Sequence, residues 1–190
     1  GTVGVAGVGW CGVSAAGVQP VGTSSIAGTD VSPNGRDVVF TSDATNLVAG
    51  DLNGAADVFL RDNQTGVTER VSIADNEAEA GLGGYQGLVS ADGRYVAFSS
   101  DAVNLVTGDT NASTDVFLRD RQAGTTIRVS VRNGGGQSDG PSYLSSMTPD
   151  AKIVVFASDA ENLIGTTAVP LDENFSTDVY IRDRTTATAK

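Results

Sequence analysis

Histidine is absent from this sequence of 190 residues, and cysteine occurs once. Without histidine, the chain's own residues cannot form a Ser-His-Asp triad or a histidine-based metal site. A lone Cys11 cannot form an intrachain disulfide, which leaves both export and the cytosol open as locations. The sequence has no run of about 18 apolar residues, so no membrane-spanning helix is expected. The commonest serine-hydrolase chemistry is therefore excluded for these residues.

Basic residues are scarce relative to acidic ones. The sequence has 12 Lys and Arg against 23 Asp and Glu, a formal net charge of −11. Nucleic acids and anionic membranes would be repelled on average, so nucleic acid is not an expected partner. Cations and basic partners are favoured, although an acidic surface can also serve solubility alone. The chain begins with Gly1 rather than Met, so we expect that a leader or a longer segment has been removed.

A six-residue word occurs three times and sets the organisation of the chain. Residues 57–62 and 115–120 read D-V-F-L-R-D, and residues 178–183 read D-V-Y-I-R-D. The spacings are 58 and 63 residues, and five extra residues in the third loop account for the difference. A fixed period of this kind indicates a repeat architecture, and local patterns are interpreted within it.

Each repeat is predicted to contain four short strands. In the first, residues 37–42 (D-V-V-F-T-S) are β-branched and aromatic, and they follow the turn residues 33–35 (P-N-G). No sustained 3.6-residue periodicity occurs, and a repeat of about 40–60 residues with four strands is typical of a β-propeller blade. Neighbouring blades would cover both faces of each sheet, which explains consecutive apolar residues. The predicted fold class is therefore all-β: three blades of four antiparallel strands, repeated about every 58 residues, forming half of a six-bladed ring.

The predicted division of the chain follows the repeat. Residues 1–25 form an N-terminal strand or arm that completes a blade, 26–83 form blade 1, 84–141 form blade 2 and 142–190 form blade 3. The last strand of blade 3 is either missing or supplied by residues 8–14, because Val13 lies 58 residues before Val71 at the end of a repeat. Three blades are too few to close a ring. Either two chains join as a homodimer, or further blades of a longer chain complete the ring.

A second pattern, D-x-N-x-x-x-D, occupies the loop before each repeated strand. Its members are Asp51, Asn53 and Asp57 in the first repeat, Asp109, Asn111 and Asp115 in the second, and Asp172, Asn174 and Asp178 in the third. Oxygen ligands at positions one, three and seven of a tight loop suit a hard cation such as Ca²⁺, which would stabilise a blade rather than catalyse a reaction. The alternative is a network of Asx turns without an ion.

One arginine in each repeated strand, Arg61, Arg119 or Arg182, shares a strand face with the aromatic residue two positions earlier. We expect these arginines to form inter-blade pairs with carboxylates, with anion binding as the minor alternative.

The order of the repeated words resembles the repeat of TolB-like β-propellers. The words are S-P-N-G-R or S-A-D-G-R, then V-V-F-T-S-D or V-A-F-S-S-D, then D-V-F-L-R-D, and the resemblance covers roughly residues 26–190. The third repeat departs from it, because Asp150-Ala151-Lys152 replaces D-G-R and alanine poorly tolerates a positive φ.

The resemblance implies a bacterial, exported protein, extracellular or periplasmic, that binds or scaffolds more than it reacts. We therefore expect a non-catalytic β-propeller module, stabilised by Ca²⁺, that assembles through blade or strand exchange and binds a protein or a glycan on one rim. The alternative is an accessory propeller domain of a larger hydrolase, a peptidase or a glycosidase, whose catalytic domain lies elsewhere. No catalytic residue is predicted within the chain.

Overall fold

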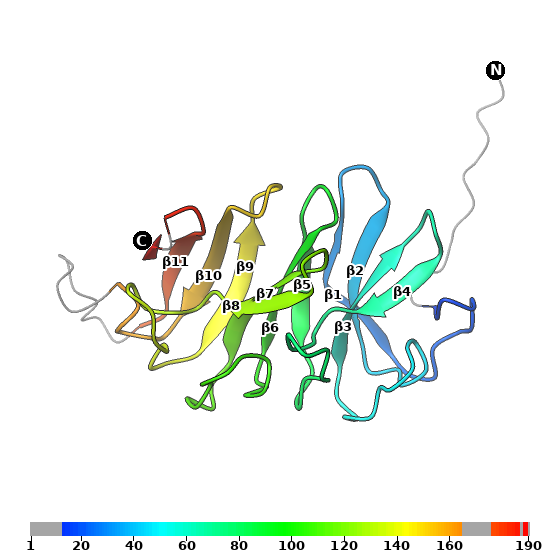
Figure 1. Cartoon of the computed structure of the whole chain (residues 1–190), viewed down its shortest axis with the longest axis horizontal. Coiled ribbons are helices and arrows are strands. Elements are labelled where there is room, and N and C mark those ends of the chain that lie inside the picture. The colour runs from blue at the N-terminus through cyan, green and yellow to red at the C-terminus, as the bar shows by residue number, and fades with distance from the viewer. Residues whose placement is uncertain (1–12, 165–175, 187, 190) are drawn as a thin grey trace, which may run out of the picture.

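Three four-stranded antiparallel sheets, each made of consecutive strands, build the molecule. The structure is a computed structural model that describes residues 13–164, 176–186 and 188–189. The sheets stand side by side, with blade 2 between blades 1 and 3 (Figure 1). Among the described residues, no helix is long and apolar enough to cross a membrane. The predicted all-β fold with four-stranded blades is confirmed.

The strands have the following bounds. Blade 1 contains β1 (Ser24–Val31), β2 (Asp37–Ser42), β3 (Asp57–Asp62) and β4 (Val67–Arg70). Blade 2 contains β5 (Tyr85–Val89), β6 (Tyr95–Ser100), β7 (Asp115–Asp120) and β8 (Thr125–Arg128). Blade 3 contains β9 (Ser142–Met147), β10 (Ile153–Ser158), β11 (Asp178–Asp183) and β12 (Thr188–Ala189).

The N-terminal segment lies against blade 1. Residues 8–12, part of the segment suggested as a strand donor to blade 3, lie outside the described residues. The carbonyl of Val13 accepts a hydrogen bond from Thr68 Oγ1 (2.5 Å), and that of Ser14 accepts one from Arg61 Nη1 (3.2 Å). The carbonyls of residues 73–74 accept hydrogen bonds from the corresponding threonine and arginine of blade 2. Val13 and Ser14 thus take the place, on blade 1, of a connector arriving from a preceding blade.

Stacked aromatic rings mark the middle of every blade. The rings pair across the two central strands, with centroids 5.7 Å apart for Phe40 and Phe59, and 5.8 Å apart for both Phe98 with Phe117 and Phe156 with Tyr180. Such cross-strand pairs stabilise a sheet beyond the area that they bury. An aromatic pair thus stands at the same register position of the two central strands in all three blades.

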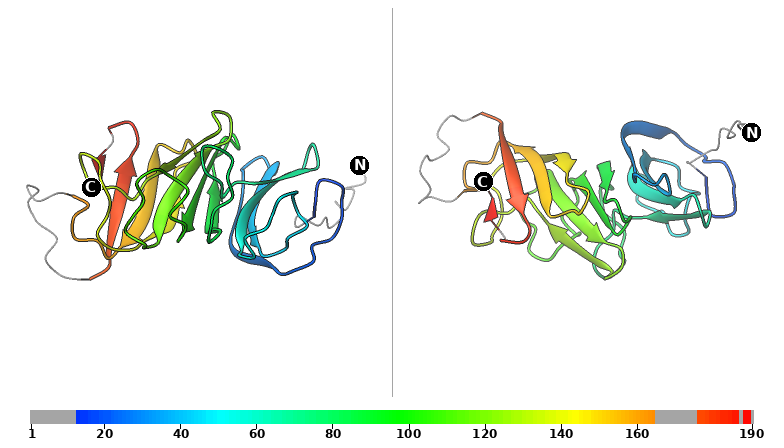
Figure 2. Two further views of the ribbon diagram at one scale, coloured as in Figure 1. Left: turned by 60° about the horizontal axis from the view of Figure 1, so that its bottom comes forward. Right: turned by 90° about the horizontal axis from the view of Figure 1, so that it is seen from above.

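Blade 2 buries both of its faces. In β6, Val96 and Phe98 belong to the apolar cluster with blade 1, whereas Ala97 between them belongs to the cluster with blade 3. Successive side chains of a strand point to opposite faces, so both neighbours are needed to cover this strand. Figure 2 shows the three sheets in a row from two further directions. The predicted cause of the consecutive apolar residues is thereby confirmed.

The turn of the third repeat keeps the geometry of the first two. Gly35 and Gly93 both have a φ of 71°, and Ala151 has a φ of 53° at the same place. The backbone N–H of Ala151 donates to the carbonyl of Thr148 at 2.8 Å, and that of Gly93 donates to Ser90 at 2.9 Å. The replacement of glycine by alanine therefore leaves the turn unchanged and places a buried methyl group within it.

The first strand of blade 2 comes very close to blade 1 at Gly87. A Cβ added to Gly87 would lie 2.2 Å from Cγ1 of Val39 and 2.7 Å from Cγ1 of Val58. Both valines are fully buried and stiff at χ1, so neither can yield easily. Glycine is required here by the close packing of two blades.

We predict that Gly87→Ala lowers the free energy of unfolding by about 1–3 kcal/mol, because the added methyl group overpacks the junction. The matched control is Gly81→Ala, where the nearest atom would lie 3.4 Å from the new Cβ. Urea unfolding of both variants measures the difference. Equal stabilities of the two variants would show that blades 1 and 2 do not pack this closely.

Candidate cation site

The D-x-N-x-x-x-D loop of blade 1 brings Asp51, Asn53 and Asp57 together. Asn53 Oδ1 accepts a hydrogen bond from the backbone N–H of Ala55 (2.8 Å), which forms an Asx turn. Asn53 Nδ2 donates to Asp57 Oδ2 and to the carbonyl of Ala80, both at 2.9 Å. The amide therefore ties the loop to β3 and to the connector, and it offers Asp57 its N–H group rather than its oxygen.

Arg70, the last residue of β4, points its guanidinium into the acidic cluster. Its Nη1 lies 2.5 Å from Glu79 Oε1 and 3.4 Å from both Asp51 Oδ1 and Asp57 Oδ2. The side chains of Arg70, Asp51 and Asp57 are 9%, 1% and 0% exposed. A buried ion pair is tolerated only where further hydrogen bonds satisfy the charges, and Ser72 Oγ supplies one to Asp57 Oδ1 at 2.6 Å. The guanidinium is thus the counter-ion of the cluster.

Asp51, Asp57 and Glu79 form a buried acidic triad that could hold a metal ion. One carboxylate oxygen from each lies within 4.8 Å of the others. Burial, assisted by the charge of Asp57, raises the pKa of Asp51, and burial also raises the pKa of Asp57. Neither oxygen of Asp51 makes a hydrogen bond to the described residues. Three carboxylates share one guanidinium, and a cation would offset the remaining negative charge.

Blade 2 repeats the arrangement with one acid fewer. Arg128 Nη1 lies 3.1 Å from Asp109 Oδ1 and 3.0 Å from Asp115 Oδ2. Asn111 Nδ2 donates to Asp115 Oδ2 at 3.2 Å, as the corresponding asparagine does in blade 1. Gln137 replaces the connector carboxylate and accepts a hydrogen bond from Arg128 Nη1 at 3.2 Å. Burial raises the pKa of Asp109. In blade 2, the guanidinium therefore faces two carboxylates, whereas in blade 1 it faces three.

The third loop is described only in part. Asp172 and Asn174 lie outside the described residues. Asp178 begins β11 and is the register partner of Ser158 in β10, as Asp57 is of Ser42. The position of Asp178 in the sheet is therefore the same as that of its counterparts.

The sequence pattern did not include Arg70, Arg128 or Glu79. The arginines do carry a repeated signal, because each precedes a Val-Ser pair at the 58-residue spacing. The serine of that pair, Ser72 or Ser130, donates to the last aspartate of the loop. Glu79 has no such signal, because glutamine stands in its place in the second repeat.

The arginines of the repeated strands were expected to pair with carboxylates between blades. Arg119 forms an ion pair with Glu77, which lies in the connector between blades 1 and 2. In the other two blades, Arg61 donates to the carbonyl of Ser14 and Arg182 donates to that of Val129. The expected pair is therefore confirmed for Arg119.

Comparisons with solved structures identify the same architecture. TolB from Acinetobacter baumannii matches with a TM-score of 0.52 and 16% identity, over 89% of this chain and 32% of that one. An oligogalacturonate lyase in complex with manganese matches with a TM-score of 0.50 and 13% identity, over 85% of this chain and 39% of that one. A scan against protein-family models and a search of the curated proteins found no match.

The chain has the fold of a TolB-like β-propeller domain. The predicted resemblance is thereby confirmed over most of the chain, and at these identities the likeness concerns the fold alone. The chain spans about a third of the length of the TolB structure that it matches.

We predict that Arg70→Met lowers the free energy of unfolding by about 3–5 kcal/mol, because it leaves buried carboxylates without their counter-ion. The matched control is Arg36→Met, which removes an arginine that is 45% exposed and paired with Asp62, whose side chain is 11% exposed. Chemical unfolding near neutral pH compares the two variants. A loss for Arg70→Met no larger than that for Arg36→Met would contradict the assigned role of the buried guanidinium.

Proposed function

We propose that this chain is a non-catalytic β-propeller module that associates through the open face of blade 3. Val179 and Ile181 of β11 are 69% and 42% exposed, whereas their counterparts in β7, Val116 and Leu118, are 0% and 1% exposed. Val116 and Leu118 lie in the cluster between blades 2 and 3. The open face of blade 3 thus exposes side chains at the positions that blade 2 uses to bind its neighbour. This observation carries the proposal, because apolar patches of this kind mark interaction surfaces.

The opposite end of the row offers the complementary face. Phe98 and Phe117 of blade 2 face blade 1, and their counterparts in blade 1 are Phe40 and Phe59, on the side away from blade 2. The two ends of the molecule therefore carry the two halves of one repeated interface, of which the half on blade 1 is already covered: Phe40 and Phe59 are 4% and 0% exposed and pack with Ala44 and Leu47. A second copy, with blade 3 of each chain against blade 1 of the other, would satisfy both halves in a ring of six blades.

The proposed role of such a ring is scaffolding, with a protein or a glycan bound on one rim. The proposed location is the periplasm or the cell exterior, which rests on the resemblance to TolB-like proteins alone. The scaffolding role depends on the association of blades, so that association is tested first.

We predict that the chain behaves as a dimer in light scattering, with about twice its monomer mass of 19.3 kDa. Replacing Val179 and Ile181 by Glu should give a folded monomer, since charged side chains cannot be buried in the apolar junction without a partner. Leu52→Glu is the control, because Leu52 is 86% exposed in a loop of blade 1. A monomeric parent chain, or a double variant that keeps the mass of the parent, would contradict the proposal.

We infer further that Ca²⁺ stabilises blade 1 through the acidic triad. Ca²⁺ prefers carboxylate oxygens, and the triad supplies three of them close together. The ion would offset the negative charge that the single guanidinium of Arg70 leaves uncompensated among these three carboxylates. Blade 2 lacks the third carboxylate at Gln137, so the inference concerns blade 1 alone.

We predict that millimolar CaCl₂ raises the thermal midpoint above its value in EDTA by about 2–4 °C, since a ligand that binds only the folded state stabilises it. Glu79→Gln should abolish the rise, because it gives blade 1 the donor set of blade 2. Glu161→Gln removes the same charge from an exposed position and should keep the rise. The inference fails if the parent chain shows no rise, or if both variants respond equally.

A further inference from the structure

Asparagine is followed directly by glycine at three places in this chain, at residues 34, 53 and 133. In such a pair the backbone nitrogen of the glycine can attack the side-chain carbonyl of the asparagine, because glycine has no Cβ to hinder the approach. Asparagine is also among the residues that are least stable to heat. Of the three pairs, only that of Asn53 lies in a D-x-N-x-x-x-D loop.

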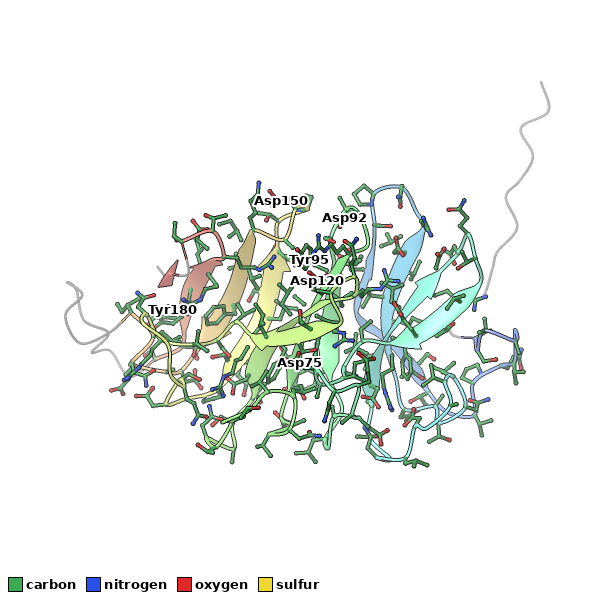
Figure 3. All side chains as sticks on the ribbon, in the orientation of Figure 1. Asp75, Asp92, Tyr95, Asp120, Asp150 and Tyr180 are labelled. Atoms are coloured by element: carbon green, nitrogen blue, oxygen red, sulfur yellow. The ribbon has the colours of Figure 1, made fainter. Side chains whose placement is uncertain are left out.

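The pair at Asn34 is held in a turn. The N–H of Gly35, which carries the attacking nitrogen, donates to the carbonyl of Ser32 at 2.7 Å. A hydrogen-bonded N–H gives up its proton less readily, so this nitrogen is a poor nucleophile. The repeat counterparts of Asn34 are Asp92 and Asp150, which lie at the same end of blades 2 and 3 (Figure 3). An acid is therefore the ordinary residue of this turn, and its formation there would add no new feature.

The pair at Asn53 has a different environment. Gly54 is exposed, and its N–H makes no hydrogen bond to the residues that the structure describes. Asn53 Oδ1 accepts the N–H of Ala55 at 2.8 Å. A donor at this oxygen stabilises the negative charge that develops on it when a nucleophile attacks the carbonyl carbon. The loop of blade 1 thus combines an available nitrogen with a polarised carbonyl.

Blade 2 supplies a matched comparison within the same chain. Asn111 stands at the position of Asn53 and donates in the same way to the last aspartate of its loop. Alanine follows it instead of glycine, and both following residues have a positive φ, 64° for Gly54 and 51° for Ala112. A Cβ added to Gly54 would meet no atom within 4 Å. The two loops therefore share a backbone conformation here, and packing does not require the glycine of blade 1.

The reaction at this pair is a deamidation with water as its co-reactant. The nitrogen of Gly54 loses its proton and bonds to Cγ of Asn53, the Cγ–Nδ2 bond breaks, and Nδ2 leaves as ammonia. Water then opens the cyclic imide. Cleavage of the bond between the nitrogen and Cγ gives aspartate, and cleavage of the bond to the main-chain carbonyl carbon gives isoaspartate. Either product places a new carboxylate at residue 53.

The new carboxylate would stand beside Asp51 and Asp57. Nδ2 of Asn53 donates to Asp57 Oδ2 and to the carbonyl of Ala80, both at 2.9 Å, and deamidation removes these two bonds. Asp51 is 5% exposed, and neither of its oxygens makes a hydrogen bond to the described residues. Buried negative charge therefore increases while its hydrogen-bond donors decrease, and a bound cation would restore the balance.

We propose that Asn53 is a site of spontaneous deamidation, and that this modification converts the acidic triad of blade 1 into a stronger Ca²⁺ site. The second half rests on the Ca²⁺ site proposed above, whereas the first half does not depend on it. The modified loop carries carboxylates at positions one, three and seven, and the number of charged ligands is what tunes the affinity of an oxygen site for Ca²⁺. The loop of blade 2 keeps its amide, because alanine follows Asn111.

The first test incubates the folded full chain at mildly alkaline pH and follows each asparagine by peptide mapping and mass spectrometry. The peptide with residue 53 should gain the mass difference between an amide and an acid, and should split into aspartate and isoaspartate forms. The peptide with Asn111 should lag behind it. Gly54→Ala copies the loop of blade 2 and should remove the gain at residue 53. The proposal is overturned if Asn53 keeps its amide, or if Gly54→Ala changes as fast as the parent chain.

The second test measures the thermal midpoint of Asn53→Asp in EDTA and in millimolar CaCl₂. The rise with CaCl₂ should exceed that of the parent chain by at least about 2 °C. Asn63→Asp is the control, since it adds the same charge at an exposed turn of blade 1. Equal rises for the two variants overturn the proposal, whatever the parent chain does. A rise for Asn53→Asp alone supports it, and contradicts only the earlier inference that the unmodified triad binds Ca²⁺.

Discussion

Burial of both faces of every blade is the constraint on which the rest of the structure depends. Blade 2 meets it fully, because its central strands place Phe98 and Phe117 against blade 1 and Ala97 and Leu118 against blade 3. Apolar residues must then follow one another along a strand, and turns must stay short and polar. Blade 3, at one end of the row, leaves one face open, whereas Phe40 and Phe59 on the outer face of blade 1 are buried. The exposure of Val179 follows from this geometry rather than from any irregularity of blade 3.

The polar framework follows from the same burial. Asp57 enters β3 at a position with no solvent contact, so its charge needs partners from the protein itself. Ser72, Asn53 and Arg70 provide them from the connector, the loop and β4. Blade 2 builds the same set around its own aspartate. The network thus ties the loop to the strand in blades 1 and 2, and Glu79, the third acid of blade 1, is an addition to this structural motif.

The sequence predicted what is local and missed what the fold brings together. Each strand pairs within one repeat, and Asp51, Asn53 and Asp57 lie within seven residues, so the period and the pattern were sufficient for both. Arg70 and Glu79 reach the same cluster only because β4 and the connector return to it. Ala151 was expected to fit its turn poorly, yet its hydrogen bond to Thr148 holds the positive φ. The hydrogen bond within the turn outweighs a residue preference of this size.

Equivalent positions in the repeats of one chain show which contacts the fold requires and which ones vary between blades. Arg121 and Arg184 both donate to a backbone carbonyl of the preceding turn, at Gly93 and at Ala151. That shared contact explains why arginine stands at both junctions. It does not require an acid, so the turn stays intact at the second junction, between blades 2 and 3, where Ile127 stands in the place of Glu69.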